Sequence, residues 1–122
     1  MTFASLKSQP AKFGSQHIQT ARDQEYLAFS RITRQLQQAI DSGDRHAMIQ
    51  AAYGNNQLWT VLAADLAQPA NGLPEQVKAG LLSLAIFSIK RGQKVLSENA
   101  SAEPLIEINL KIMKGLRGEV QP

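Results

Sequence analysis

The side chains best suited to acid–base or metal chemistry are two histidines, His17 and His46, which stand far apart in the sequence. Neither lies near a nucleophile motif or near carboxylates at the spacing of a metal site. Asp44 precedes His46 at a predicted helix start, so a surface or capping role fits His46 better than general-base chemistry. The chain has no cysteine, and Gly72 and Gly80 lack the surroundings of a phosphate-binding loop. The sequence therefore predicts a protein that is not an enzyme and holds no metal or cofactor.

The basic residues are the next candidates, as a surface for nucleic acid. The formal net charge is +3, with six basic and four acidic residues through Thr60 and seven basic and six acidic residues after it. This even spread, without exposed aromatic residues between the cations, is not typical of a nucleic-acid interface. The best remaining cations are Lys90, Arg91, Lys94, Lys111, Lys114 and Arg117. Cations near a helix C-terminus also complement the helix dipole, so RNA contact stays an open alternative.

Helices must position these residues, because apolar residues recur at spacings of three and four and strand signals are absent. A chain of 122 residues, 43% hydrophobic and 19% charged, fits one globular domain. We expect an all-α fold, a small bundle of about four helices. This single domain should span residues 15–122, after a flexible N-terminal arm at residues 1–14. The predicted helices span residues 15–41, 44–67, 74–98 and 101–117.

No segment has the pattern of a signal peptide or a membrane span. The N-terminal stretch lacks the apolar core of a signal peptide. The longest apolar-rich run, residues 80–89, is far shorter than the ~20 residues that cross a bilayer, and Lys90 and Arg91 follow it directly. We therefore expect a cytoplasmic protein that makes no membrane contact.

The first two predicted helices place polar residues among apolar ones. Glu25 falls on the apolar stripe of the first helix, where it either sits at a frayed end or finds a buried donor. Asp44 is the expected N-cap of the second helix, and Asn55 on its inner stripe needs a hydrogen-bonding partner. Trp59 points inward on the same helix. Gly54 indicates close approach of a neighbouring helix or a local bend.

A rigid corner is predicted between the second and third helices. Pro69 disfavours helical geometry in the residue before it, Asn71 and a glycine follow, and Pro74 suits the first turn of a new helix. Asp65 lies near a helix C-terminus, where the macrodipole disfavours a carboxylate. We therefore expect Asp65 to cap backbone amides of the next segment or to pair with a nearby base. All four residues are assigned a structural role.

The last two helices carry more apolar surface than one packing face requires. The third is apolar on most sides, and the fourth has an apolar arc of about 200°, well beyond the ~100° that one face needs. For the third helix this pattern fits either the central helix of the bundle or a helix that receives a partner on its outer face, and in the fourth helix one stripe is available for a partner. Asn109 projects into the middle of the arc. It is either a hydrogen-bonded specificity device within the bundle or a contact for a guest helix.

Several motifs occur in an order that resembles the FlaF family of flagellar biosynthesis regulators. The motifs are Leu58-Trp59, Asp65-Leu66, PANGLP at residues 69–74, LIEIN at residues 105–109 and Gly115-Leu116. The resemblance covers residues 56–116, about half the chain, and none of these motifs is catalytic. It implies a small cytoplasmic helical protein that binds flagellin for secretion and acts with the regulator FlbT in controlling flagellin production.

The resemblance implies a non-enzymatic, chaperone-like role in which the chain binds unassembled flagellin and supports its regulated synthesis and secretion. We hypothesise that the third and fourth predicted helices form a groove for an amphipathic helix of flagellin. The candidate contact residues, chosen for aromatic or flexible apolar character, are Trp59, Phe87, Ile106, Leu110 and Met113. Two alternatives stay open: direct action on flagellin messenger RNA through the basic helix ends, and an adaptor role with FlbT as partner.

Overall fold

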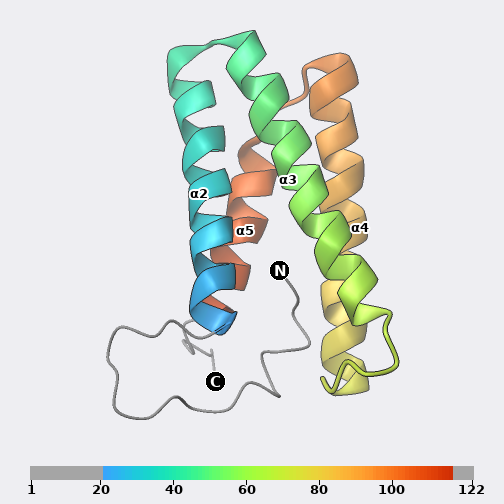
Figure 1. The fold of residues 1–122 in the computed structure, drawn as a ribbon. Helices are drawn as coiled ribbons and strands as arrows, with labels where there is room; N and C mark the ends of the chain where they lie inside the picture. Colours follow the sequence, from blue (N-terminus) through green and yellow to red (C-terminus); the bar gives the residue numbers. More distant parts are fainter. Residues whose placement is uncertain (1–20, 117–122) are drawn as a thin grey trace, which may run out of the picture.

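The computed structural model describes residues 21–116, which fold into four α-helices (Figure 1). These helices are α2 (Ala21–Ser42), α3 (Arg45–Leu66), α4 (Glu75–Glu98) and α5 (Glu103–Leu116). No strand occurs within this range, and the predicted all-α bundle of about four helices is confirmed. The predicted arm at residues 1–14 and the start of the first predicted helix lie outside the described residues.

The helices run alternately up and down, so helices that follow one another in sequence are antiparallel (Figure 1). α3 packs against α2 on one side and against α4 on the other, and α5 closes the bundle against α2. The interface between α4 and α5 is the least extensive of these four. α3 and α5 lie across the bundle from each other, without close backbone approach.

The turn between α2 and α3 is fixed by two neighbouring residues. Gly43 has a φ of +68°, a left-handed conformation that glycine adopts without strain, and its amide donates to the carbonyl of Ala39 at 3.0 Å. Asp44 then caps α3, because its Oδ1 accepts from the amides of His46 at 2.9 Å and Ala47 at 3.3 Å. The predicted N-cap is confirmed, and His46 lies exposed in the first turn of α3.

Asn71 is the centre of the corner between α3 and α4. Its side chain is buried, its Oδ1 accepts from the amide of Leu73 at 3.0 Å, and its Nδ2 donates to Oδ2 of Asp65 at 3.5 Å. Asp65 is thus joined to the corner through a side-chain amide, a partner that the sequence did not predict. Pro69 lies exposed in the turn, and Pro74 stands directly before α4 with an extended ψ of 147°.

Two apolar clusters fill the bundle. One surrounds Trp59, whose ring meets that of Phe29 edge-on, with centroids 5.4 Å apart and planes at 71°. The other surrounds Leu36 and includes Val95 of α4 and Leu105 of α5. Each cluster draws residues from all four helices, so the four helices share one packed interior.

Candidate protein-docking surface

Three hydrogen bonds link four buried side chains across α3, α4 and α5. The indole N–H of Trp59 donates to Oδ1 of Asn109 at 2.9 Å. Nδ2 of Asn109 donates to Oδ1 of Asn55 at 2.8 Å, and Nδ2 of Asn55 donates to Oγ of Ser88 at 3.2 Å. Because the indole nitrogen only donates, Asn109 must turn its oxygen toward Trp59, and this choice fixes the orientation of Asn55 in turn. All four residues are 0% exposed, so this hydrogen-bond chain stabilises the interior of the bundle.

Two of the five predicted contact residues, Trp59 and Met113, lie inside the bundle. Trp59 is fully buried, and Met113 is 9% exposed with its sulfur accepting a hydrogen bond from Oγ1 of Thr33 at 3.9 Å. In this conformation neither side chain can touch a partner, which corrects their place in the predicted groove. Of the two roles left open for Asn109, the structure shows the one inside the bundle.

The other three predicted contact residues are more accessible but do not form one surface. Phe87 is 52% exposed on α4 and Leu110 is 47% exposed on α5, whereas Ile106 is partly buried against the cluster around Leu36. Leu110 lies three residues before Met113, which contacts α2, so Leu110 lies toward the α2 side of α5. Phe87 belongs to α4, the neighbour on the opposite side of α5. The predicted groove therefore does not unite these side chains.

The outer face of α3 carries no charge. From His46 to Ala64 the sequence contains no aspartate, glutamate, lysine or arginine. Three large apolar side chains are exposed on this helix: Ile49 at 39%, Tyr53 at 58% and Val61 at 42%. Depletion of charge and enrichment of tyrosine are features of the centre of protein–protein interfaces. The signal was present in the sequence as a charge-free run, but the apolar periodicity of α3 reports only its buried side.

A groove of about 500 Å³ runs between this face of α3 and the adjacent side of α4, which lie side by side in Figure 1. The residues that line the groove are Tyr53, Asn56, Gln57, Thr60 and Val61 of α3 and Ile89, Gln93 and Leu96 of α4. Ile86 is 56% exposed and lies one turn before Ile89, beside the groove. Gly92 leaves room for the side chain of Asn56 between the two helices, because a Cβ at this position would overlap it. We refer to this feature as the α3–α4 groove.

Along most of its length α4 carries positive charge only. Between Gln76 and Ser97 its charged residues are Lys78, Lys90, Arg91 and Lys94. Nζ of Lys78 pairs with Oε1 of Glu75 at 3.8 Å, and Nε of Arg91 donates to the carbonyl of Ser101 at 2.9 Å. Two of these four cations therefore already have partners.

The other two cations, Lys90 and Lys94, are exposed and form no ion pair with the described residues. Lys90 lies four residues after Ile86 and three before Gln93, so it stands on the rim of the α3–α4 groove. Lys94 follows Lys90 by one turn along the same outer side of α4. The rim is therefore basic on the α4 side and uncharged on the α3 side.

Glu25 on α2 is a buried acid. It is 1% exposed, and neither of its carboxylate oxygens has a hydrogen-bond partner among residues 21–116. Burial raises the pKa of Glu25 to about 8, and the nearby charge of Asp65 adds to the rise. The sequence allowed a frayed end or a buried donor, and the structure shows a buried acid to which no side chain or amide in residues 21–116 donates. Its carboxyl group is therefore mostly protonated at neutral pH.

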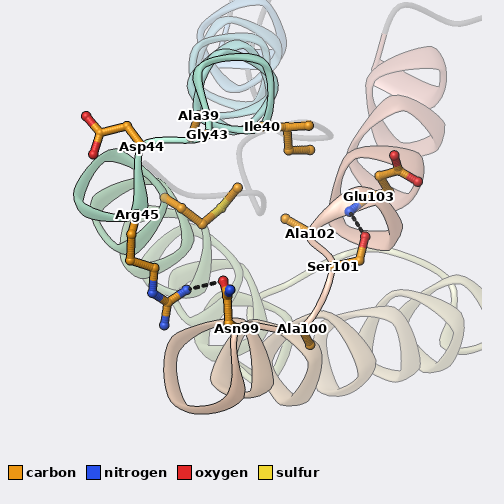
Figure 2. A pocket seen from close by; sticks show the side chains of 11 residues that line it. Ala39, Ile40, Gly43, Asp44, Arg45, Asn99, Ala100, Ser101, Ala102 and Glu103 are labelled. Atoms are coloured by element: carbon orange, nitrogen blue, oxygen red, sulfur yellow. Dashed lines mark hydrogen bonds between the residues drawn. The ribbon is translucent and has the colours of Figure 1, made fainter.

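A hollow of about 270 Å³ lies at one end of the bundle, between the α2–α3 turn and the α4–α5 turn (Figure 2). Arg45 forms one of its walls, and its guanidinium donates to the carbonyls of Val95 at 2.8 Å and Leu96 at 2.7 Å and to Oδ1 of Asn99 at 2.9 Å. Asn99 has a φ of 56° and ends α4. Since Arg45 caps α4 and Asp44 caps α3, we assign this hollow to helix capping.

The fold and its surface define a class of protein: a small up-and-down helical bundle whose accessible features are an apolar groove and a few cations. Within residues 21–116, no group of three histidine, cysteine, aspartate or glutamate side chains is placed to hold a metal ion. No helix in the same range is long and apolar enough to cross a membrane.

Comparison with known families then identifies the chain. The family model for the flagellar protein FlaF matches residues 11–116, so the chain belongs to the FlaF family. The match extends the resemblance seen in residues 56–116 through α2 and begins within the predicted arm. Neither a curated protein nor a solved structure matches the chain.

Proposed function

We propose that this chain is a non-enzymatic regulator of flagellum biogenesis that binds unassembled flagellin and supports its regulated synthesis and secretion. Membership of a flagellar protein family supports the flagellar part of the proposal. The observation that carries the binding part is the α3–α4 groove, where Tyr53, Val61 and Ile86 are exposed beside an uncharged helix face. Apolar side chains gathered in this way are stabilised when a partner removes them from water.

A protein with such a groove can act by covering an apolar stripe of its partner. A subunit that has not yet assembled exposes apolar stripes that its neighbours will later bury, and those stripes promote premature association. A protein that binds only the unassembled form stabilises that form in proportion to its own concentration and affinity. The bound protein must dissociate before the subunit assembles. This requirement favours a small interface, in which a few residues supply most of the binding energy, over an extensive permanent interface.

The proposal is tested by measuring the solution mass of the full-length chain alone, of unassembled flagellin alone and of their mixture. We expect a complex in the mixture whose mass is the sum of whole numbers of the two chains. Two separate species with unchanged masses would refute flagellin binding.

The same preparation distinguishes the two alternatives. Direct binding to flagellin messenger RNA should weaken steeply with added salt, because each neutralised phosphate releases counterions. Binding of FlbT without flagellin, in separate pull-down experiments, would favour an adaptor role. We expect the flagellin complex to weaken less steeply with added salt than an RNA complex would, since the face of α3 has no charge and the α4 side contributes only Lys90 and Lys94.

A further inference from the structure

We infer that the α3–α4 groove receives one amphipathic helix whose polar edge carries carboxylates facing Lys90 and Lys94. This inference deepens the proposed function and rests on it for flagellin as the natural partner. Three features of the described residues support it: the exposed apolar side chains at the groove, the absence of acids beside them, and the unpaired Lys90 on the rim with the unpaired Lys94 one turn further along α4.

The groove fits a helix better than an extended strand. Both of its walls are helices, whose backbone amides and carbonyls are paired within each helix, so an extended segment would find no backbone partners there. A helical guest satisfies its own backbone groups and needs only to bury side chains. From Ile49 to Val61 the exposed face of α3 extends about 18 Å, the length of roughly three helical turns. A guest helix of about that length would cover it.

The charge on the rim of the α3–α4 groove determines which amphipathic helix binds most tightly. Lys90 and Lys94 follow Ile86 along α4, and the nearest acid on that helix, the exposed Glu98, lies one turn after Lys94 and two turns after Lys90. A guest with carboxylates along one edge of its apolar stripe can form ion pairs at the rim while the stripe is buried. A guest with a basic edge meets like charge at Lys90, which lowers its affinity.

The same charges disfavour a second copy of this chain as the occupant. In a two-fold symmetric pair, each copy presents the same patch to the other. Lys90 and Lys94 of each copy would then face the other copy's groove, whose α3 wall supplies no acid. A dimer that closes the groove in solution, detected by mass and lost in Ile86→Asp, would overturn the inference.

Two synthetic peptides test the preference for an acidic edge. They share one helical apolar stripe and differ only in whether glutamate or lysine flanks it. Each is titrated against the full-length chain at low salt. The glutamate-edged peptide is expected to bind about tenfold more tightly or better than the lysine-edged peptide. Equal binding of the two peptides, or binding of neither, would overturn the inference.

Two matched variants locate the peptide on the surface. Ile86→Asp changes the groove, and Leu110→Asp is its control, because both residues are about half exposed on helices. Ile86→Asp should weaken binding of the glutamate-edged peptide about tenfold or more, and Leu110→Asp should leave it unchanged. Circular dichroism checks that both variants stay folded. A folded Ile86→Asp that binds like wild type, or equal losses in both folded variants, would contradict the groove.

A charge reversal tests the two lysines. The double variant Lys90→Glu/Lys94→Glu should prefer the lysine-edged peptide over the glutamate-edged one, because the sign of the rim is inverted. An unchanged preference for the glutamate-edged peptide would show that these lysines do not select the guest.

Unassembled flagellin, tested with the same variants, separates this inference from the proposed function. We expect Ile86→Asp to lose flagellin binding and Leu110→Asp to keep it. If the glutamate-edged peptide binds and flagellin does not, the groove is right and the proposed function is wrong. If flagellin binds Ile86→Asp as well as wild type, the proposed function is right and the groove is wrong.

Discussion

Asn109 joins α5 to α3 through two hydrogen bonds, one from Trp59 and one to Asn55. The sequence predicted that both asparagines need partners. It could not name them, because the bonded residues are 50 and 54 positions apart in the chain. A buried amide without a partner is costly, so only an arrangement of α3, α4 and α5 that completes this hydrogen-bond chain is well satisfied.

Asn109→Leu should therefore be strongly destabilising. It leaves the indole N–H of Trp59 and Oδ1 of Asn55 without partners, and each unsatisfied buried group costs about 1–3 kcal/mol. We expect the free energy of unfolding, measured in urea, to fall by about 2–5 kcal/mol. Ser88→Ala removes only the last acceptor of the chain and should cost about 1–2 kcal/mol. A loss in Asn109→Leu no greater than that in Ser88→Ala would contradict this explanation.

Glu25 makes the stability of the bundle depend on pH. The folded-state pKa of about 8 lies above the ordinary value of 4.5, so the folded protein holds a proton that the unfolded chain releases. The free energy of unfolding should therefore fall as the pH rises from about 4.5 to about 8, by a few kcal/mol at most. Glu25→Gln should flatten this decline, whereas Glu107→Gln, at an exposed site, should not. Parallel pH profiles for wild type and Glu25→Gln would refute the role of Glu25.

Helix ends were the elements that the sequence predicted best. Asp44 caps α3, as its local chemistry indicated, and Pro74 lies at the start of α4 but directly before the helix rather than in its first turn. Caps and prolines act on backbone groups within one turn, so neighbouring residues are enough to predict them. The burial of Glu25 could not be predicted in this way, because the residues that surround its side chain come from other parts of the fold.

The surface of α5 could not be predicted in the same way. Its apolar arc was interpreted as surplus left for a partner, but α5 packs against α2 and α4 and reaches α3 through Asn109. Neighbours on three sides use most of the arc and leave Leu110 exposed. Periodicity identifies an apolar stripe but not the number of neighbours that cover it.

Two glycines within α4 test the close approach of α4 to α3. A Cβ at Gly92 would overlap the side chain of Asn56, so Gly92→Ala must displace that side chain and should lower the free energy of unfolding by about 1–3 kcal/mol. Gly80 has open space around the same position, so Gly80→Ala should raise it by about 0.4–1 kcal/mol. Urea unfolding measures both. Stabilisation by Gly92→Ala would contradict the tight floor of the α3–α4 groove.

Across the whole molecule, the distribution of charge distinguishes one face from the others. α2 and α5 carry acids and bases together, whereas α3 has no charge between His46 and Ala64 and α4 has only cations between Gln76 and Ser97. A bundle of this size can stay folded without an uncharged outer face, so stability alone does not explain it. Coverage by a partner does explain it, and the exposure of Tyr53 and Ile86 on that face is consistent with coverage.

Photo-crosslinking to unassembled flagellin tests most directly the claim that a partner binds at the α3–α4 groove. A photoreactive amino acid is placed in the full-length chain at Tyr53, beside the groove, or at Leu110, toward the α2 side of α5, since both positions are exposed. We predict a crosslink to flagellin from position 53 and none from position 110. A crosslink from position 110 alone, or a stable complex that crosslinks from neither position, would contradict binding at the α3–α4 groove.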